Sequence, residues 1–266
     1  WHMRLPRVLF ALVIGAALGL CGALSQGLFR NPLADPGLLG VSTGAACAAA
    51  LCIVIGASLP QTLALSLPEG WRSYSLPLAA FAGALATCLC LDSLARWLTP
   101  GSVSGLLLTG IALNALAAAC IGVCTYLSND EQLRNLSFWT LGSLAAASWP
   151  MLALMAAMLA GLALCLPQIA RQLNALALGS EAAQQSGVVL SRLRWQVVLA
   201  VAILTGAAMA WCGAISFIGL VAPHLVRIWL GADQRKVIPG AMLSGALLLL
   251  LADTLARTLA LPAEIP

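Results

Sequence analysis

Long apolar runs with almost no charge constrain this chain more than any other feature. Only 8% of its 266 residues are charged, whereas a soluble domain carries about 25%. A membrane-spanning helix needs about 20 consecutive apolar residues, because the hydrocarbon core of a bilayer is about 30 Å thick. We therefore predict an all-α fold, a polytopic membrane helical bundle with eight spans. The predicted spans are 8–28, 38–58, 75–95, 106–127, 149–167, 196–212, 215–230 and 237–256.

The basic residues favour one of the two sides between which the loops alternate. One side holds Arg30, Arg96, Arg171, Arg192, Arg194, Arg227, Arg235 and Lys236, and the other holds Arg4, Arg7, Arg72, Arg134 and Arg257. Loops rich in Lys and Arg stay in the cytoplasm. The first side is therefore assigned to the cytoplasm, together with the polar stretch 168–195.

This polar stretch is too long for a simple turn, and its sequence predicts two short helices. Gly179 ends the first by adopting a left-handed conformation. Ser180 caps the second, Glu181 complements the positive end of its dipole, and Gly187 ends it. Short amphipathic helices on the face of a membrane bundle suit docking to a soluble partner. A solvated connector is the alternative.

Two proline-containing segments interrupt the helical pattern. The seventh span, 215–230, is barely long enough and contains Pro223 and His224, so we expect a kinked or discontinuous helix. Such a break lines a transport path or is a packing kink without a ligand. The segment 29–37 carries Pro32 and Pro36, and we expect a rigid corner that shapes a pore mouth or merely joins two helices.

Charged pairs and small residues predict a compact bundle without a proton relay. Asp92 with Arg96 and Asp253 with Arg257 are four residues apart near span ends, where they can pair. Their shallow positions weigh against an ion-coupled transporter. Gly15 and Gly19 share one helix face and allow close helix packing.

The sequence contains no pattern that predicts enzyme or metal chemistry. It has no phosphate-binding loop of the Gly-x-x-x-x-Gly-Lys-Ser/Thr type and no nucleophile–base constellation. Its nine cysteines lie mostly in apolar runs, without the spacing of a metal site. We therefore expect no catalytic residue, no metal and no bound cofactor. ATP and Mg²⁺ would bind to another polypeptide.

Three segments resemble the FecCD-type permease subunits of ABC importers for iron–siderophores, haem and cobalamin. They are Arg4–Val8 with Gly27–Gly44, then Leu176–Ala183, and finally Gly213–Arg227 continuing to Leu251–Arg257. The resemblance runs in order over the whole chain. It implies a single transmembrane permease domain, 1–266, that lacks the first and last of the family's roughly ten spans.

The resemblance also implies partners and a location. The expected partners are a second copy of the chain, ATP-binding cassette subunits, a periplasmic substrate-binding protein and the lipid bilayer, with no nucleic acid. The expected location is the bacterial inner membrane. The expected mechanism is alternating access driven by ATP.

Residue roles follow from the same resemblance. Coupling to the ATPase falls to Leu176, Ala177, Leu178, Gly179, Ser180, Glu181, Ala182, Gln184 and Gly187. The gate and translocation path comprise Leu33, Val103, Ser104, Thr109 and Asn114, although Val103 replaces an expected small polar residue. Binding-protein docking falls to Arg4, Arg7 and Arg257. His224 matches a histidine interpreted as structural.

The substrate is the least constrained inference. The segment Asn129–Ser143 resembles haem permeases in general sequence character more than it resembles cobalamin permeases. Haem is therefore our first choice of substrate, followed by ferric siderophore and then cobalamin. The rivals are an ATP-independent secondary transporter or channel, and a membrane-embedded enzyme.

Overall fold

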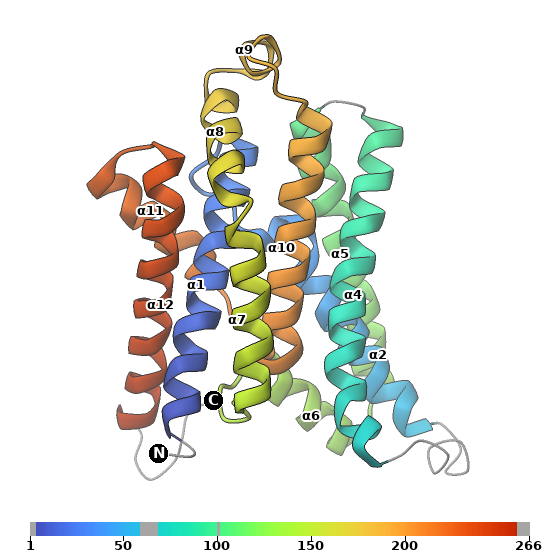
Figure 1. Cartoon of the computed structure of the whole chain (residues 1–266). Helices are drawn as coiled ribbons and strands as arrows, with labels where there is room; N and C mark the ends of the chain where they lie inside the picture. Colours follow the sequence, from blue (N-terminus) through green and yellow to red (C-terminus); the bar gives the residue numbers. More distant parts are fainter. Residues whose placement is uncertain (1–3, 59–68, 100–101, 260–266) are drawn as a thin grey trace.

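The computed structural model describes residues 4–58, 69–99 and 102–259, and within them the regular structure is helical (Figure 1). A 3-10 helix, η1, spans Pro36–Leu39. The α-helices are α1 (Arg4–Phe29), α2 (Val41–Ser58), α4 (Glu69–Leu98), α5 (Val103–Leu127), α6 (Asp130–Leu141), α7 (Trp149–Ala163), α8 (Leu166–Ala177), α9 (Ser180–Gln185), α10 (Leu190–Cys212), α11 (Ile218–Leu230) and α12 (Gln234–Leu259). The predicted all-α membrane fold is confirmed.

The count of eight full spans is only approximate. Within the described residues, five helices are long and apolar enough to cross a membrane: α1, the Tyr74–Leu98 part of α4, α5, α10 and α12. The fifth predicted span bends by 56° between α7 and α8, and it gives a sixth crossing if the pair is taken together. The remaining two predicted spans form the shorter helices α2 and α11. The 3-10 helix η1 takes the place of the start of the predicted span 38–58, and residues 215–217 at the start of the predicted span 215–230 are not helical.

Helix α1 forms the centre of the bundle and packs against α12, α10, α11 and α7. Its close approach to α12 depends on the predicted glycine face. A Cβ on Gly15 would lie 2.8 Å from Ala246 Cα, and a Cβ on Gly19 would lie 2.9 Å from the Ala241 carbonyl carbon. Small residues therefore allow backbone-to-backbone packing along this seam.

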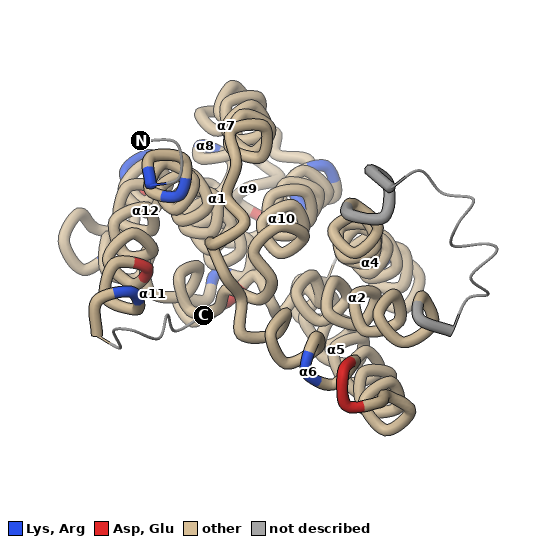
Figure 2. The backbone as a smooth tube through the Cα atoms, turned by 90° about the horizontal axis from the view of Figure 1, so that it is seen from below, with Lys and Arg blue, Asp and Glu red and all other residues tan. Residues whose placement is uncertain are grey.

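The bundle has two ends, which we call the α9 end and the α6 end (Figure 1). The α9 end carries the end of α1 and the starts of α5, α10 and α12. The α6 end carries Arg4 and the last turn of α12. Viewed from the α6 end, charged positions are few and most of the bundle is uncharged (Figure 2).

Helix α6 was not predicted as a separate element. Its capping box consists of Asn129 and Gln132, where the Asn129 side chain accepts from Gln132 N at 2.9 Å and Gln132 Oε1 accepts from Asn129 N at 3.0 Å. Asp130 and Glu131 occupy its first turn, where negative charge is favourable. This local pattern was readable from the sequence.

Candidate functional site

An ion-pair cluster joins the two termini of the described bundle at the α6 end. Asp253 Oδ1 accepts from Arg7 Nη2 at 2.8 Å and from Arg7 Nε at 3.0 Å, while Asp253 Oδ2 lies 3.0 Å from Arg257 Nη2. The pair within α12 confirms the expected Asp253–Arg257 interaction. The contact with Arg7, 246 positions away in sequence, could not be predicted from local spacing.

This arrangement holds two arginines on one buried carboxylate. The side chain of Asp253 is 4% exposed, whereas those of Arg7 and Arg257 are 15% and 24% exposed. Arg4 lies on the same helix as Arg7 and is exposed. The structure therefore brings the two predicted docking residues Arg7 and Arg257 together, with Asp253 as the residue that positions them.

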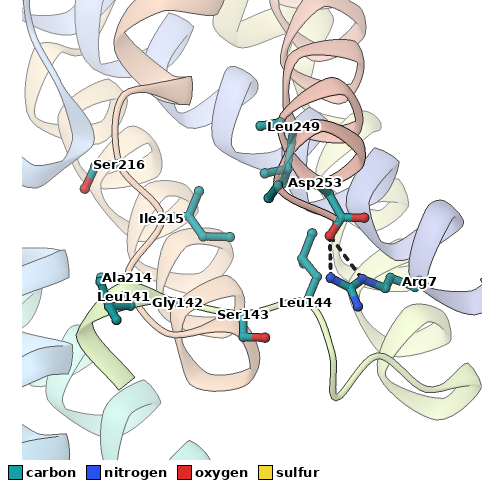
Figure 3. Close-up of a pocket in the computed structure, with 12 residues that line it drawn as sticks. Arg7, Leu141, Gly142, Ser143, Leu144, Ala214, Ile215, Ser216, Leu249 and Asp253 are labelled. Atoms are coloured by element: carbon teal, nitrogen blue, oxygen red, sulfur yellow. Dashed lines mark hydrogen bonds and ion pairs between the residues drawn. The ribbon is translucent and has the colours of Figure 1, made fainter. Parts of the chain in front are cut away.

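A cavity of about 260 Å³ opens beside the Arg7–Asp253 pair (Figure 3). Its walls come from the α6–α7 connection, from 214–216 and from α12. Ser143 and Ser216 add hydroxyls to a lining that is otherwise mostly apolar. Cys212 O accepts from Ser143 N at 2.7 Å, which ties the α6–α7 connection to the end of α10.

The predicted gate residues lie at the opposite, α9 end. Leu33 is 67% exposed in the corner between α1 and η1. Val103 and Ser104 begin α5, and the Ser102 side chain caps this helix by accepting from Gly105 N at 3.0 Å. Val103 and Ser104 share a cavity of about 290 Å³ with the coupling residues Leu176 and Ser180. The structure thus brings residues predicted for the gate and residues predicted for coupling to one cavity.

The two predicted path residues on α5 already have hydrogen-bond partners inside the protein. Thr109 Oγ1 donates to Gly105 O of its own helix at 2.8 Å. Asn114 Nδ2 donates to Gly37 O at 3.0 Å, and its Oδ1 accepts from Thr43. Asn114 therefore fastens η1 and α2 to α5, a positioning role that the sequence did not indicate.

The corner before η1 is rigid, as expected. Asp35 Oδ1 accepts from Gly37 N at 2.7 Å and caps η1. Burial raises the pKa of the Asp35 carboxyl above its ordinary value, while this backbone hydrogen bond opposes the shift. Pro36 is buried and contacts the start of α11 through Gly219.

The polar stretch forms the two predicted short helices, α8 and α9. Helix α8 buries Ile169, Ala170, Leu173 and Leu176 along one face, which seats it on the bundle. The residues that follow are more open: Leu178 is 81% exposed, and Glu181 and Gln184 are exposed. Ala177 and Gly187 are likewise exposed, and Gly179 and Ala182 are partly exposed.

One detail of this segment was predicted wrongly. Gly179, rather than Ser180, is the N-cap of α9, and the Ser180 side chain makes no capping hydrogen bond. Gly179 has a positive φ of 122°, which favours glycine, but its ψ of 156° is not that of the left-handed helical conformation. Gly187 has φ 82° and ends α9 as predicted.

Helix α8 is also linked to the start of α12. Asn174 Nδ2 donates to Asp233 Oδ1 at 2.6 Å, and Asn174 Oδ1 accepts from Gln234 N at 2.8 Å. Backbone donation from Arg235 and side-chain donation from Asn174 lower the pKa of Asp233. These two hydrogen bonds fasten α8 to the start of α12.

Helix α11 runs from Ile218 through Pro223 to Leu230, so the discontinuity expected at the proline is absent, and the non-helical part of this segment lies before the helix, at 213–217. The start of α11 lies beside α1. Pro223 has no N–H for the carbonyl of Gly219, and that carbonyl packs against Gly22 of α1. Gln26 is 2% exposed, donates to Leu220 O at 3.1 Å and accepts from Arg227. Gln26, which the sequence did not single out, therefore ties α1 to α11 through one backbone and one side-chain contact.

Two further residues lie at or near the start of α11. Phe217 has φ 68° and a side chain that is 70% exposed, and it precedes the first residue of α11. His224 lies on an exposed face of α11. Among the described residues, no group of three or more His, Cys, Asp or Glu side chains is arranged to hold a metal ion.

Comparison with known proteins places the whole chain in one family. The model of the FecCD transport family matches residues 1–266. The chain is 51% identical over 272 residues to the hemin transport system permease protein HmuU of Yersinia pestis, covering 100% of this chain and 78% of the relative. It is 42% identical over 266 residues to the vitamin B12 import system permease protein BtuC of Salmonella typhi, covering 100% and 77%.

Solved structures agree with the observed fold. An inward-facing structure described as a metal-chelate type ABC transporter has a TM-score of 0.83 and 33% identity, covering 99% of this chain and 80% of that one. PsaBC from Streptococcus pneumoniae has a TM-score of 0.66 at 17% identity, covering 97% and 84%, which supports the fold alone.

Proposed function

Because the chain belongs to the FecCD transport family, a family of ABC importer permeases, we propose that its cargo is haem. One observation carries the choice: identity reaches 51% with a hemin permease and 42% with a vitamin B12 permease, both over the whole chain. The permease of such an importer is not itself the ATPase. Cobalamin, favoured by the second relative, is the alternative cargo, and ferric siderophore is the third.

The two ends of the bundle then receive distinct roles. The α9 end faces the cytoplasm of a bacterium, across its inner membrane, and residues Leu176–Gly187 dock on ATP-binding subunits. The α6 end faces the periplasm, where Arg4, Arg7 and Arg257 meet acidic residues of a substrate-binding protein. A second copy of the chain completes the translocation path.

Geometry supports a route from ATP to the gate. Closure of the ATPase subunits would push on α8 and α9. Leu176 and Ser180 share a cavity with Val103 and Ser104, so this push reaches the start of α5. The Asn174 contacts carry it to α12, whose other end holds Asp253 and the docking arginines. One displacement would thereby act on both ends of the path.

Growth on haem tests the cargo. A bacterial strain without its own haem permease would express this protein together with its cognate ATPase and binding protein. The strain would then be grown with haem, with a ferric siderophore or without an added iron source. Growth on haem alone is the expected result. Growth only on the siderophore, or rescue of a cobalamin-requiring strain without growth on haem, would refute haem as cargo. Either result would still be consistent with an importer permease.

The same strain tests coupling. Replacing Glu181, Ala182, Ala183 and Gln184 with glycine should melt α9, so that ATP hydrolysis continues without uptake. A matched control places four glycines in the exposed part of α6. Undiminished uptake in the α9 variant would refute the coupling assignment.

A further inference from the structure

The cavity of about 290 Å³ at the α9 end has the lining of an anion site. Two arginines, Arg30 and Arg194, and several serines face it, and no carboxylate is among its described lining residues. Its volume lies near the lower limit of ~300–1,000 Å³ for small-molecule pockets. A small charged group would therefore fill it better than a large cargo.

Arg194 is buried with unused hydrogen-bonding capacity. Its side chain is 8% exposed, and its Nε lies 3.5 Å from Asp92 Oδ1 but makes no hydrogen bond. The other carboxylate oxygen of Asp92 is 2.9 Å from Arg96. One carboxylate thus faces two guanidinium groups, of which Arg96 is largely exposed whereas Arg194 is buried and keeps N–H groups that Asp92 does not engage. Burying such a charge is costly unless a partner neutralises it.

Two long helices direct their N-terminal ends at the same cavity. Helix α5 begins there with Ser102–Ser104, and α10 begins there with Leu190 and Ser191. The N-terminal end of a helix carries partial positive charge and free backbone N–H groups, which favour anions. Within the described chain, no hydrogen bond engages the hydroxyls of Ser104 or Ser191, so both remain able to donate.

We propose that this cavity binds a phosphate group, held by Arg30, Arg194 and the serine hydroxyls. The chemistry is shared by inorganic phosphate and the headgroup of an anionic phospholipid. Basic pockets between membrane helices on the cytoplasmic side are known to accept such headgroups. The bound group would hold the start of α5, with Val103 and Ser104, against α10 and the coupling residues. This site is independent of which cargo the protein carries.

Thermal unfolding in a neutral detergent provides the first test. Sodium phosphate would replace sodium chloride at constant ionic strength, because a ligand that binds only the folded state raises the unfolding midpoint in a saturable way. Arg30→Gln and Arg194→Gln should each weaken the apparent affinity at least about tenfold, as expected for a lost hydrogen bond to a charged group. Arg192→Gln is the matched control, since Arg192 is exposed on α10 and does not line the cavity.

Measuring retained lipid distinguishes a phospholipid headgroup from free inorganic phosphate as the bound group. The protein and its variants would be placed in nanodiscs of phosphatidylcholine with or without phosphatidylglycerol, and bound lipid would be counted by native mass spectrometry. Phosphatidylglycerol retained by the wild type and by Arg192→Gln, but lost from both cavity variants, assigns the site to a headgroup. A saturable phosphate effect that needs both arginines assigns it to the free ion.

The proposal fails if neither phosphate nor phosphatidylglycerol distinguishes the cavity variants from the control. It also fails if Arg30→Gln alters only the affinity for the ATPase subunit, because the cavity would then receive a protein carboxylate. Arg30 is exposed in a loop, so its variant keeps the test valid even if Arg194→Gln does not fold.

Discussion

Replacing Gly22 with alanine should destabilise the protein by displacing helix α11 from α1. An added Cβ would lie 2.5 Å from the Gly219 carbonyl carbon and 2.7 Å from Gly219 Cα, and closer still to the carbonyl oxygen. Ordinary carbon–carbon contact is about 3.5–4.0 Å. One of the two backbones must therefore retreat by roughly 1 Å. Neither moves freely, since Gly219 is also confined by Pro36 on its other side.

The expected cost follows from these distances. Overpacking a well-packed core costs about 1–3 kcal/mol, and two backbones in contact place this site towards the upper end. The intrinsic preference of a helix for alanine over glycine returns about 0.8–1.0 kcal/mol. We expect a net loss of about 2 kcal/mol, which lowers the unfolding midpoint by roughly 4–8 °C for a chain of this size.

Gly122→Ala is the matched control, because a Cβ at Gly122 in α5 meets nothing within 4 Å. Its midpoint should stay constant or rise. Thermal unfolding of the detergent-solubilised protein, followed by tryptophan fluorescence, measures both variants. Equal midpoints for Gly22→Ala and Gly122→Ala would refute the close contact between α1 and α11.

Three further substitutions test other contacts. Asp253→Asn should lower stability by about 1–3 kcal/mol, since two charge-assisted contacts lose their carboxylate, and should weaken binding-protein docking in a pull-down; an unchanged midpoint and affinity would exclude Asp253 as the positioning residue. Asn174→Ala should reduce uptake per ATP hydrolysed without reducing ATPase binding, and unchanged coupling would remove the α8–α12 route. Asp35→Ala should cost about 1 kcal/mol through the lost cap of η1, measured by thermal unfolding, whereas equal stability would show that the corner does not depend on this hydrogen bond.

Acidification should loosen the link between α8 and α12. The folded-state pKa of Asp233 lies below its ordinary value, so its contribution to stability is present above the unfolded-state pKa and disappears as the pH falls through the folded-state pKa. Hydrogen exchange at Gln234 N should rise over that range, and Asp233→Asn should remove the dependence. An identical pH profile in both proteins would contradict this assignment.

Local patterns predicted the helices but not how they meet. Apolar runs placed all eight predicted spans on helices, and the four-residue spacing of Asp92 with Arg96 and of Asp253 with Arg257 correctly indicated ion pairs. The spacing could not reveal that each carboxylate also faces a second arginine, Arg194 or Arg7, from a distant helix. Such contacts depend on tertiary packing, which leaves no local periodicity.

The candidate site likewise combines features that the local sequence predicts with contacts that only the tertiary fold reveals. Pro223 predicted a kinked or discontinuous helix, but α11 continues through it, and the hydrogen bond between Gln26 and Arg227 joins residues 201 positions apart. Asn114 was interpreted as a path residue because it is polar within an apolar span. Its amide also joins η1 and α2 to α5. A polar residue in a membrane helix therefore identifies a need for hydrogen bonding, and only the fold shows which group meets that need.

ATP-driven uptake into proteoliposomes tests the central claim most directly. The protein would be reconstituted with its cognate ATPase and binding protein and offered haem, a ferric siderophore and cobalamin side by side. We expect haem to accumulate only with ATP and binding protein present, while the other two compounds remain outside. Uptake that proceeds equally without ATP would contradict the importer itself, and ATP-dependent uptake of cobalamin or siderophore in place of haem would contradict the proposed cargo.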